Sequence, residues 1–546
     1  MREPIQRRHP WIKWLAGALL LFMILLGIGI AIAVHHAEPF LRALIVDRLT
    51  ERFHAHVELD SFHVSLAHGL RAEGKGLRIW PPAQVEGLEV TPPRGTAEPL
   101  IDLREFHFRA PLRYAPGTPI HIWTVTLDGL KVTIPARPHR ASASERSAPG
   151  PEPALPLPKG AERLRFRIDR VLCKDAHVIL QNANPAKQPI EFDIQTIDVA
   201  HMNSAGKMAF QAVLTNPRPK GLITTKGNFG PWVVDDPGNT PLDGDYGFDH
   251  ADLGTFKGIA GILSSTGRYQ GTLRDLTVDG QTHTPAFSLT HFGATVPLDT
   301  TFHARVDSTN GDTWLQPVRA TLGSTRFTAS GKIVQMLAPI NGKGSPMHTI
   351  GHQIALQVDV EQGQIADFLR LASKSGQAMM SGALHMKTTF DLPPGSEPIH
   401  ERMRMKGNFA LDDVLFSNQK LQNRIADLSL RGQGKPQQAK TAAVTDVRSS
   451  MEGDFSMAGG AIDFPSLHYM VPGAEILLNG VYGLDGGTLA FRGTARLDAP
   501  VSKIVGGWKG WLLKPVDPLF RKKGAGTVVH VHVAGTRREP QFGIDF

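Results

Sequence analysis

The amino-acid sequence predicts a mainly β protein, elongated or divided into several domains, behind a single N-terminal membrane-spanning helix. Three observations support this prediction. One uninterrupted apolar run lies near the start, and apolar and polar residues alternate with a two-residue period along much of the remaining chain. Glycine and proline are abundant, at 55 and 40 of 546 residues, which favours turn-rich β structure over helical bundles.

Residues 15–34 form the apolar run, LAGALLLFMILLGIGIAIAV, which contains no charge and no proline. As a helix it would span roughly 30 Å, the hydrocarbon thickness of a bilayer. Basic residues precede it, at Arg2, Arg7, Arg8 and Lys13. We therefore expect residues 1–14 in the cytoplasm and the bulk of the chain across the membrane, with Trp11 and Trp14 at the interface. The alternative is a signal peptide cleaved near 31–33, but the run is longer than the usual 7–15 apolar residues of such peptides.

Residues 35–54 are expected to form an amphipathic helix, because apolar residues recur there at three- and four-residue spacing. From residue 55 a two-residue period replaces the helical one, so 55–134 is predicted as a first β segment. Residues 135–160 are rich in Pro, Ala and Ser and are expected to form a linker without a core. A long β region, 161–500, follows the linker.

The last segment, 501–546, is predicted to contain an amphipathic helix and a closing strand around 528–533. Trp508 and Trp511 lie among lysines in that helix. This pattern is typical of an interfacial helix at an anionic bilayer, although a helix that caps the end of the β structure explains it too.

The clearest alternation runs from Leu164 to Val171, and a second runs from Ile354 to Val360. Strands of this kind expose one face to water and turn the other to something apolar. Two sheets could cover each other as β-sandwiches, or one sheet could leave a concave apolar face for lipid or a partner. Pattern alone leaves both open. Some 25 strands stacked at about 4.8 Å would extend roughly 120 Å. The best-patterned candidates for a lipid-facing wall, each of which could equally be ordinary core, are Leu164, Phe166, Ile168, Ile354, Leu356, Val358 and Val360.

Composition narrows the possible partners and chemistry. The net charge is +8, but no dense basic block with interleaved aromatic residues is present, so we expect no nucleic-acid partner. Cys173 is the only cysteine, which leaves no internal disulfide and no thiol metal cluster. Phe (26) greatly outnumbers Tyr (5), which suits walls that contact hydrocarbon.

We expect no catalytic residues, no metal and no cofactor. Nucleophile elbows, phosphate-binding loops and H-E-x-x-H motifs do not occur in the sequence. His54/His56 and His530/His532 could form imidazole pairs, but a third ligand of suitable spacing is missing. Asp412 and Asp413 are expected to point to opposite faces of a strand, which argues against paired acid–base chemistry.

The beginning and the end of the chain resemble the AsmA family of envelope proteins, relatives of TamB and the bridge-like lipid-transfer proteins. The motifs that carry the resemblance are turn and strand signatures. They include Val57-Glu58-Leu59, Ser65-Leu66-Ala67-His68-Gly69-Leu70, Gly227-Asn228-Phe229-Gly230-Pro231, Gly407-Asn408-Phe409-Ala410-Leu411, Leu428-Ser429-Leu430-Arg431-Gly432 and Val471-Pro472-Gly473-Ala474.

This resemblance implies a long, twisted β-sheet groove (a β-taco) that binds acyl chains and carries phospholipid between the inner and outer membranes. It implies a single-pass inner-membrane protein with its bulk in the periplasm, and no catalytic residues. The alternative is a non-transporting envelope scaffold, or a factor for outer-membrane protein assembly, with envelope proteins as partners. A polysaccharide enzyme built on stacked β structure is a third class, which the few tyrosines and the lack of an acidic motif argue against.

Overall fold

The computed structural model describes residues 55–65, 69–80, 98–111, 120–134, 166–181, 189–203, 206–290, 294–436, 447–500 and 527–545. Short gaps within these ranges lie at 232, 234–236, 309, 340–346, 374–375 and 538, and a few isolated positions such as 49 and 503 are also described.

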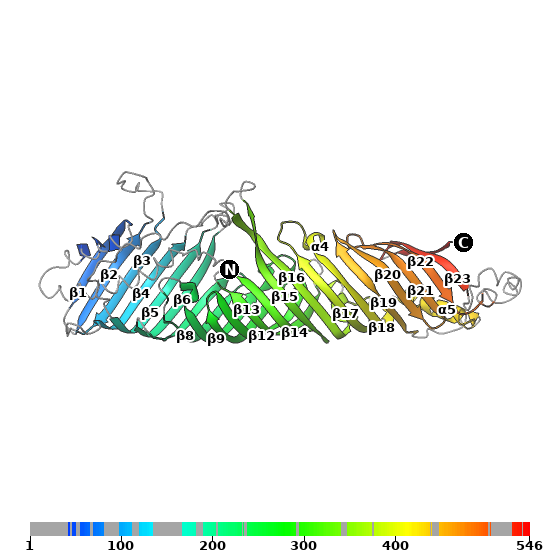
Figure 1. Ribbon diagram of the computed structural model, residues 1–546, viewed down its shortest axis with the longest axis horizontal. Helices are drawn as coiled ribbons and strands as arrows, with labels where there is room; N and C mark the ends of the chain where they lie inside the picture. Colours follow the sequence, from blue (N-terminus) through cyan, green and yellow to red (C-terminus); the bar gives the residue numbers. More distant parts are fainter. Residues whose placement is uncertain are drawn as a thin grey trace, which may run out of the picture.

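The described residues fold mainly as β-strands, and all 24 described strands belong to one long, twisted, open sheet (Figure 1). The first strands are β1 (Val57–Ser65), β2 (Leu70–Ile79), β3 (Ile101–Ala110), β4 (Ile120–Ile134), β5 (Phe166–Leu180), β6 (Ile190–Asn203), β7 (Met208–Pro217) and β8 (Lys220–Phe229). The middle strands are β9 (Pro241–Asp252), β10 (Ile259–Ala260), β11 (Ile262–Thr272), β12 (Asp275–Leu289), β13 (Thr295–Asp307), β14 (Asp312–Leu322), β15 (Thr325–Pro339) and β16 (Met347–Gln364). The last are β17 (Met380–Leu392), β18 (Arg404–Phe416), β19 (Ser449–Ala458), β20 (Ala461–Val471), β21 (Ala474–Gly483), β22 (Thr488–Leu497), β23 (Thr527–Thr536) and β24 (Pro540–Asp545).

Neighbouring strands pair in chain order and almost all are antiparallel. The exception is the β4–β5 pair, which is parallel. A parallel pair needs a crossover of a dozen or more residues, and the segment between Ile134 and Phe166 is long enough to supply it. The short β10 pairs with β12 beside β11. In the part of the chain that the structure describes, no second sheet covers the first, so the sandwich alternative does not apply there.

In the part of the chain that the structure describes, the helices with both ends defined are few and short. They are α3 (Ile365–Leu371), α4 (Ile399–Arg402), α5 (Gln419–Gly432) and the 3₁₀ turns η1 (Pro237–Asn239) and η2 (Leu253–Thr255). Asn418 caps α5, because its side-chain oxygen accepts hydrogen bonds from the backbone N–H groups of Lys420 and Leu421. Segment 428–432, which we assigned to turn and strand signatures, lies in α5. That prediction was wrong. Helix α5 buries Ile425 and Ala426, and packing of this buried side stabilises the segment as a helix.

Strand pairing brings the apolar positions of successive strands to the same side of the sheet. On β16, Ile354 faces Ile333 of β15 and Leu392 of β17, and Leu356 faces Gly331 and Phe390. The same side continues through the β17–β18 pair Phe390 and Met405. We call this side of the sheet the apolar face and the other side the polar face. Side chains directly opposite each other lie on one side, so a register kept over many strands makes a continuous surface.

At the N-terminal end the apolar face belongs to a buried cluster. Phe106, Phe108, Ile122 and Ile168 are at most 2% exposed there. Leu49, one of six helical positions described between 42 and 50, packs into the same cluster at 1% exposure. This end of the sheet is therefore closed by protein.

The predicted anchor 15–34, the linker 135–160 and nearly all of 501–526 lie outside the described residues. Among the helices that are described, none has the length and apolar character needed to cross a bilayer.

Candidate functional site

The apolar face of β15–β24 is the candidate functional surface. On β16 and β17 the inward residues Ile354, Leu356, Met386 and Phe390 are half-buried, whereas Val360, Leu384 and Thr388 are buried. Half-buried and buried inward positions also occur together as far as β23. Large exposed apolar surfaces often mark places where proteins bind an apolar ligand or partner, which makes this face the candidate.

The four candidates on β16 share this face. Ile354, Leu356 and Val358 are half-buried. Val360 is 1% exposed and packs with Leu384 and neighbouring residues in a cluster of its own. The structure therefore leaves three of the four with surface for a ligand.

The candidates at the start of β5 are placed differently. Ile168 is fully buried opposite Ile122 and Met202, so its side chain contacts protein. Phe166 begins β5 opposite Ile120, and Leu164 lies outside the described residues. The membrane-interface candidates Trp11, Trp14, Trp508 and Trp511 also lie outside them.

A row of phenylalanines on the apolar face extends over β18–β22 and was missed by sequence reasoning. Phe409 has its ring centroid 6.2 Å from those of both Phe455 and Phe464, and Phe464 lies 5.9 Å from Phe491. Such pairs stabilise each other beyond their burial. Each phenylalanine lies in an alternating segment, but only the strand register shows that the rings are neighbours.

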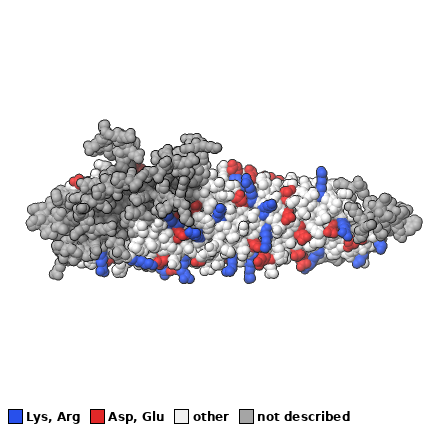
Figure 2. Space-filling model, viewed as in Figure 1, with Lys and Arg blue, Asp and Glu red and all other residues white. Residues whose placement is uncertain are grey.

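The polar face carries ion pairs between neighbouring strands. Lys387 Nζ lies 3.2 Å from an Asp359 carboxylate oxygen, and both His468 ring nitrogens face glutamates, Glu452 and Glu475. Figure 2 shows positive and negative residues interspersed over the visible surface rather than separated by sign. A surface of this kind keeps the sheet soluble without creating a strong field of one sign.

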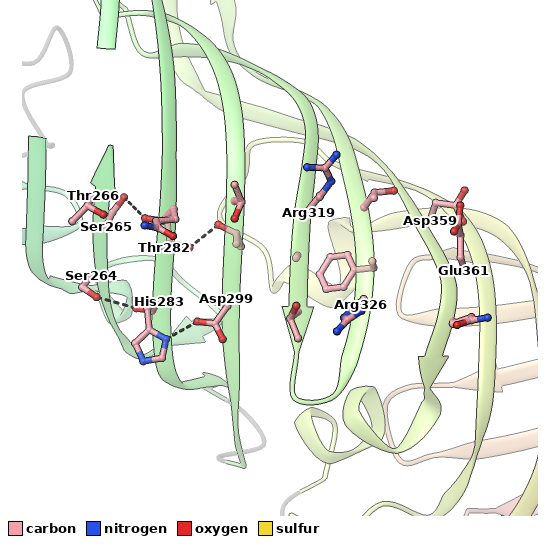
Figure 3. A pocket seen from close by; sticks show the side chains of 18 residues that line it. Ser264, Ser265, Thr266, Thr282, His283, Asp299, Arg319, Arg326, Asp359 and Glu361 are labelled. Carbon is pink, nitrogen blue, oxygen red and sulfur yellow. Dashed lines mark hydrogen bonds and ion pairs between the residues drawn. The ribbon is translucent and has the colours of Figure 1, made fainter. Parts of the chain in front are cut away.

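A cleft of about 930 Å³ lies over β11–β16, and its charged lining residues occupy outward positions (Figure 3). His283 Nδ1 lies 2.5 Å from Asp299 Oδ1. The Ser264 hydroxyl donates to the backbone oxygen of His283, at 3.5 Å, and not to its ring. Serine and histidine therefore do not form a nucleophile–base pair here.

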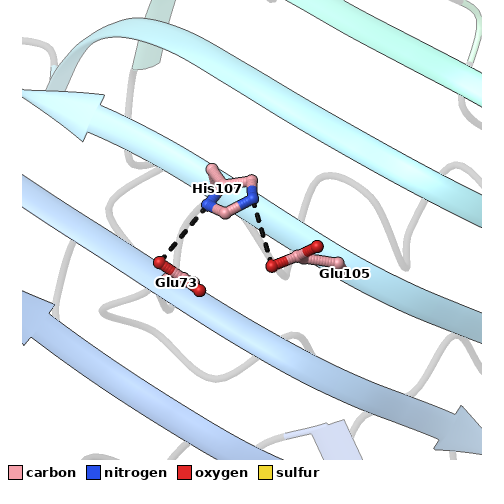
Figure 4. A group of neighbouring side chains, drawn as sticks. All are labelled: Glu73, Glu105 and His107. Atoms are coloured by element: carbon pink, nitrogen blue, oxygen red, sulfur yellow. Dashed lines mark ion pairs between the residues drawn. The ribbon is translucent and has the colours of Figure 1, made fainter.

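Two groups of side chains have the spacing of metal ligands in the described residues. One consists of Glu73, Glu105 and His107, on β2 and β3 (Figure 4). Lys75 Nζ lies 3.3 Å from Glu105, and the hydrogen bond and charge of Glu105, followed by the charge of Glu73, raise the pKa of Lys75. The Lys75 ammonium thus already pairs with both carboxylates, and ion pairing accounts for their closeness. The second group is His177, Glu191 and Asp193, in which His177 Nδ1 lies 2.8 Å from Asp193 Oδ1.

The expectation for Asp412 and Asp413 was wrong. Both are exposed between the buried residues Leu411 and Val414, at a point where the β18–β19 register shifts. A β-bulge turns both side chains to the polar side. Asp413 forms an ion pair with Arg448 at 3.5 Å.

No family model, curated protein or solved structure matches this chain. Its own geometry therefore carries the functional argument.

Proposed function

We propose that this chain is an inner-membrane-anchored envelope protein whose apolar sheet face shelters lipid acyl chains and supports phospholipid transport and outer-membrane homeostasis. In this proposal residues 15–34 are the anchor and the sheet extends into the periplasm. The resemblance of the sequence to the AsmA family supports the same assignment.

One observation carries the proposal. The apolar face continues over successive strands, and part of it, including Ile354, Leu356 and Phe390, stays partly exposed between β15 and β23. Strands stacked at about 4.8 Å give a sheet on the order of 100 Å long. That length suits movement across a gap rather than the holding of one small ligand.

Solvation is the physical mechanism. An acyl chain in water costs about 0.8 kcal/mol per exposed CH₂, or about 12 kcal/mol for a chain of about 15 methylenes. An apolar strip next to the chain lowers this barrier continuously, and no bond is made or broken. The function needs no catalytic residue, metal or cofactor.

The test is to purify the full chain in detergent, extract it with organic solvent and quantify lipid by mass spectrometry. A photo-crosslinking residue at position 354 should capture lipid, whereas the same residue at the outward position 357 should not. Protein without bound lipid, or equal capture at both positions, would overturn the proposal.

A non-transporting scaffold for envelope proteins is the second candidate. The open edge of the sheet favours it, because β24 pairs only with β23 among the described strands and edge strands are templates for a partner's strand. Phe542 on β24 is 51% exposed. This function predicts co-purifying protein and no lipid.

A further inference from the structure

The apolar face changes character between β8 and β13. Side chains with hydroxyl groups occupy its central positions there, in place of aliphatic ones. We call this set the hydroxyl belt; its members are Thr225, Tyr246, Ser265, Tyr269, Thr282 and Thr300.

Glycines let the two tyrosines lie along the sheet. A Cβ on Gly244 would lie 2.8 Å from Tyr269 Cζ, and a Cβ on Gly267 would lie 2.8 Å from a Tyr246 ring carbon. A Cβ on Gly280 would lie 2.6 Å from the Tyr246 phenol oxygen. The tyrosine rings therefore cover these three glycines, and the phenol groups lie close to the sheet instead of projecting away from it.

The two hydrogen bonds of the belt that involve tyrosine each have one direction that satisfies their partners. The Thr225 hydroxyl donates to the backbone oxygen of Asp245 at 2.9 Å. Its 2.7 Å contact with the Tyr269 phenol must therefore use the phenol proton. In the same way Ser265 donates to the backbone oxygen of Gln281 at 3.0 Å, so Tyr246 donates to Ser265 at 3.1 Å.

Both phenol protons are thus used within the protein. Burial raises the pKa of Tyr246 and of Tyr269, so both phenols stay protonated at neutral pH. Each phenol oxygen keeps lone pairs that can accept a further hydrogen bond. The belt therefore offers acceptors to whatever lies over the apolar face at this point.

We propose that the hydroxyl belt binds the hydrogen-bond-donating head group of a lipid, an ammonium or a hydroxyl, while the acyl chains lie on the neighbouring apolar residues. This inference rests on the proposed function and names the class of lipid. A trimethylated ammonium head group lacks N–H and O–H donors and would be disfavoured.

The experiment presents the full-length protein with vesicles of phosphatidylethanolamine, phosphatidylglycerol or phosphatidylcholine that carry identical acyl chains. The first two head groups supply ammonium and hydroxyl donors, and the third supplies none. Each hydrogen bond contributes about 1 kcal/mol net, or about fivefold. Because the two phenol oxygens can accept two such bonds, we expect roughly 25-fold more phosphatidylethanolamine or phosphatidylglycerol than phosphatidylcholine on the wild-type protein.

The test variant is Tyr246→Phe with Tyr269→Phe, which keeps the rings and removes the two phenol oxygens. Its preference for phosphatidylethanolamine and phosphatidylglycerol over phosphatidylcholine should be at least about fivefold smaller than that of the wild-type protein, because at least one hydrogen bond to the head group is lost. The matched control is Thr224→Val with Thr301→Val, which removes two hydroxyls from exposed positions on the polar face of β8 and β13, outside the belt. It should keep the wild-type preference.

The outcomes separate the two claims. Equal binding of all three lipids by the wild-type protein would refute the belt inference and leave the proposed function standing. An unchanged preference in the double variant would refute it as well. Binding of none of the lipids would refute the proposed function, and the belt inference with it.

Discussion

A carboxylate placed on the apolar face at Leu356 should abolish lipid binding without unfolding the protein. Leu356 is half-buried on β16, opposite Gly331 on one side and Phe390 on the other. Because Gly331 has no side chain, an aspartate at 356 has room to be accommodated. Its charge would point toward the ligand.

The expected magnitudes follow from the burial. Complete burial of a leucine contributes roughly 1.5–3 kcal/mol, so losing a half-buried one should cost about 1 kcal/mol of folding stability. The free energy of lipid binding should change by more than the folding stability does. An acyl chain must leave roughly three methylenes unsheltered near the charge, which costs about 2.4 kcal/mol. That cost corresponds to roughly 60-fold less bound lipid.

The assay compares Leu356→Asp with Gln357→Asp, which adds the same charge one residue further on, at an exposed outward position. Bound lipid is measured per mole of purified protein, and a thermal melt checks folding. We expect a large loss for the first variant and none for the second. Wild-type lipid content in folded Leu356→Asp protein would refute the reasoning, as would equal loss in both variants.

Three further predictions concern stability and reactivity. Ile168→Ala should lower the free energy of unfolding by about 3 kcal/mol, because this side chain is fully buried; chemical denaturation measures it. Burial raises the pKa of Cys173 to about 11, so alkylation at pH 8 should be at least a hundredfold slower in native than in urea-unfolded protein. The hydrogen bond from Arg170 lowers the pKa of Asp198, so stability from this pair is present above about pH 4 and lost as the pH falls through the lowered value. Arg170→Gln should therefore lower stability at pH 7, and the difference from the wild-type protein should shrink as the pH falls below about 4, measured by denaturation over a pH series.

The strand content could be predicted from the sequence because alternation is a local property. The segment around Ile354–Val360 alternates, and it forms part of β16. Which strands are neighbours is a non-local property. The phenylalanine row and the hydroxyl belt were missed for that reason, since each joins residues from several strands. Helix α5 was missed because its end, Leu428-Ser429-Leu430, also fits the two-residue period of a strand.

Prolines inside strands indicate where the pairing register shifts. Pro285, Pro317 and Pro465 lie in β12, β14 and β20, each where the pairing register shifts. Proline cannot donate to a ladder, so within a sheet it is confined to edges and bulges. At each of these three positions the proline and one adjacent residue are both exposed, just as Asp412 and Asp413 are both exposed at their bulge.

The apolar face stays continuous because neighbouring strands break the two-residue spacing of their apolar residues at the same point. In β4 the apolar positions step by three between Leu127 and Leu130, and in β5 they step by three between Cys173 and Ala176. If only one strand had a step of three, all of its later apolar side chains would lie on the polar face of the sheet, out of line with those of the neighbouring strands. Here the steps coincide. The register runs unbroken from β1 to β6, and Gly129 and Asp175, both with positive φ, lie at the same level.

On the polar face, Arg104 forms ion pairs with Asp128 and Asp175, next to Gly129, and so stabilises the strands at this bulge. The Gly129 conformation, with φ +66°, is one that few other residues adopt without strain. The sheet thus keeps one apolar side because neighbouring strands bulge together. The capacity to shelter a long acyl chain therefore lies in the shared register of many strands, and a one-residue insertion in a single strand should disrupt it more than the loss of any one apolar side chain.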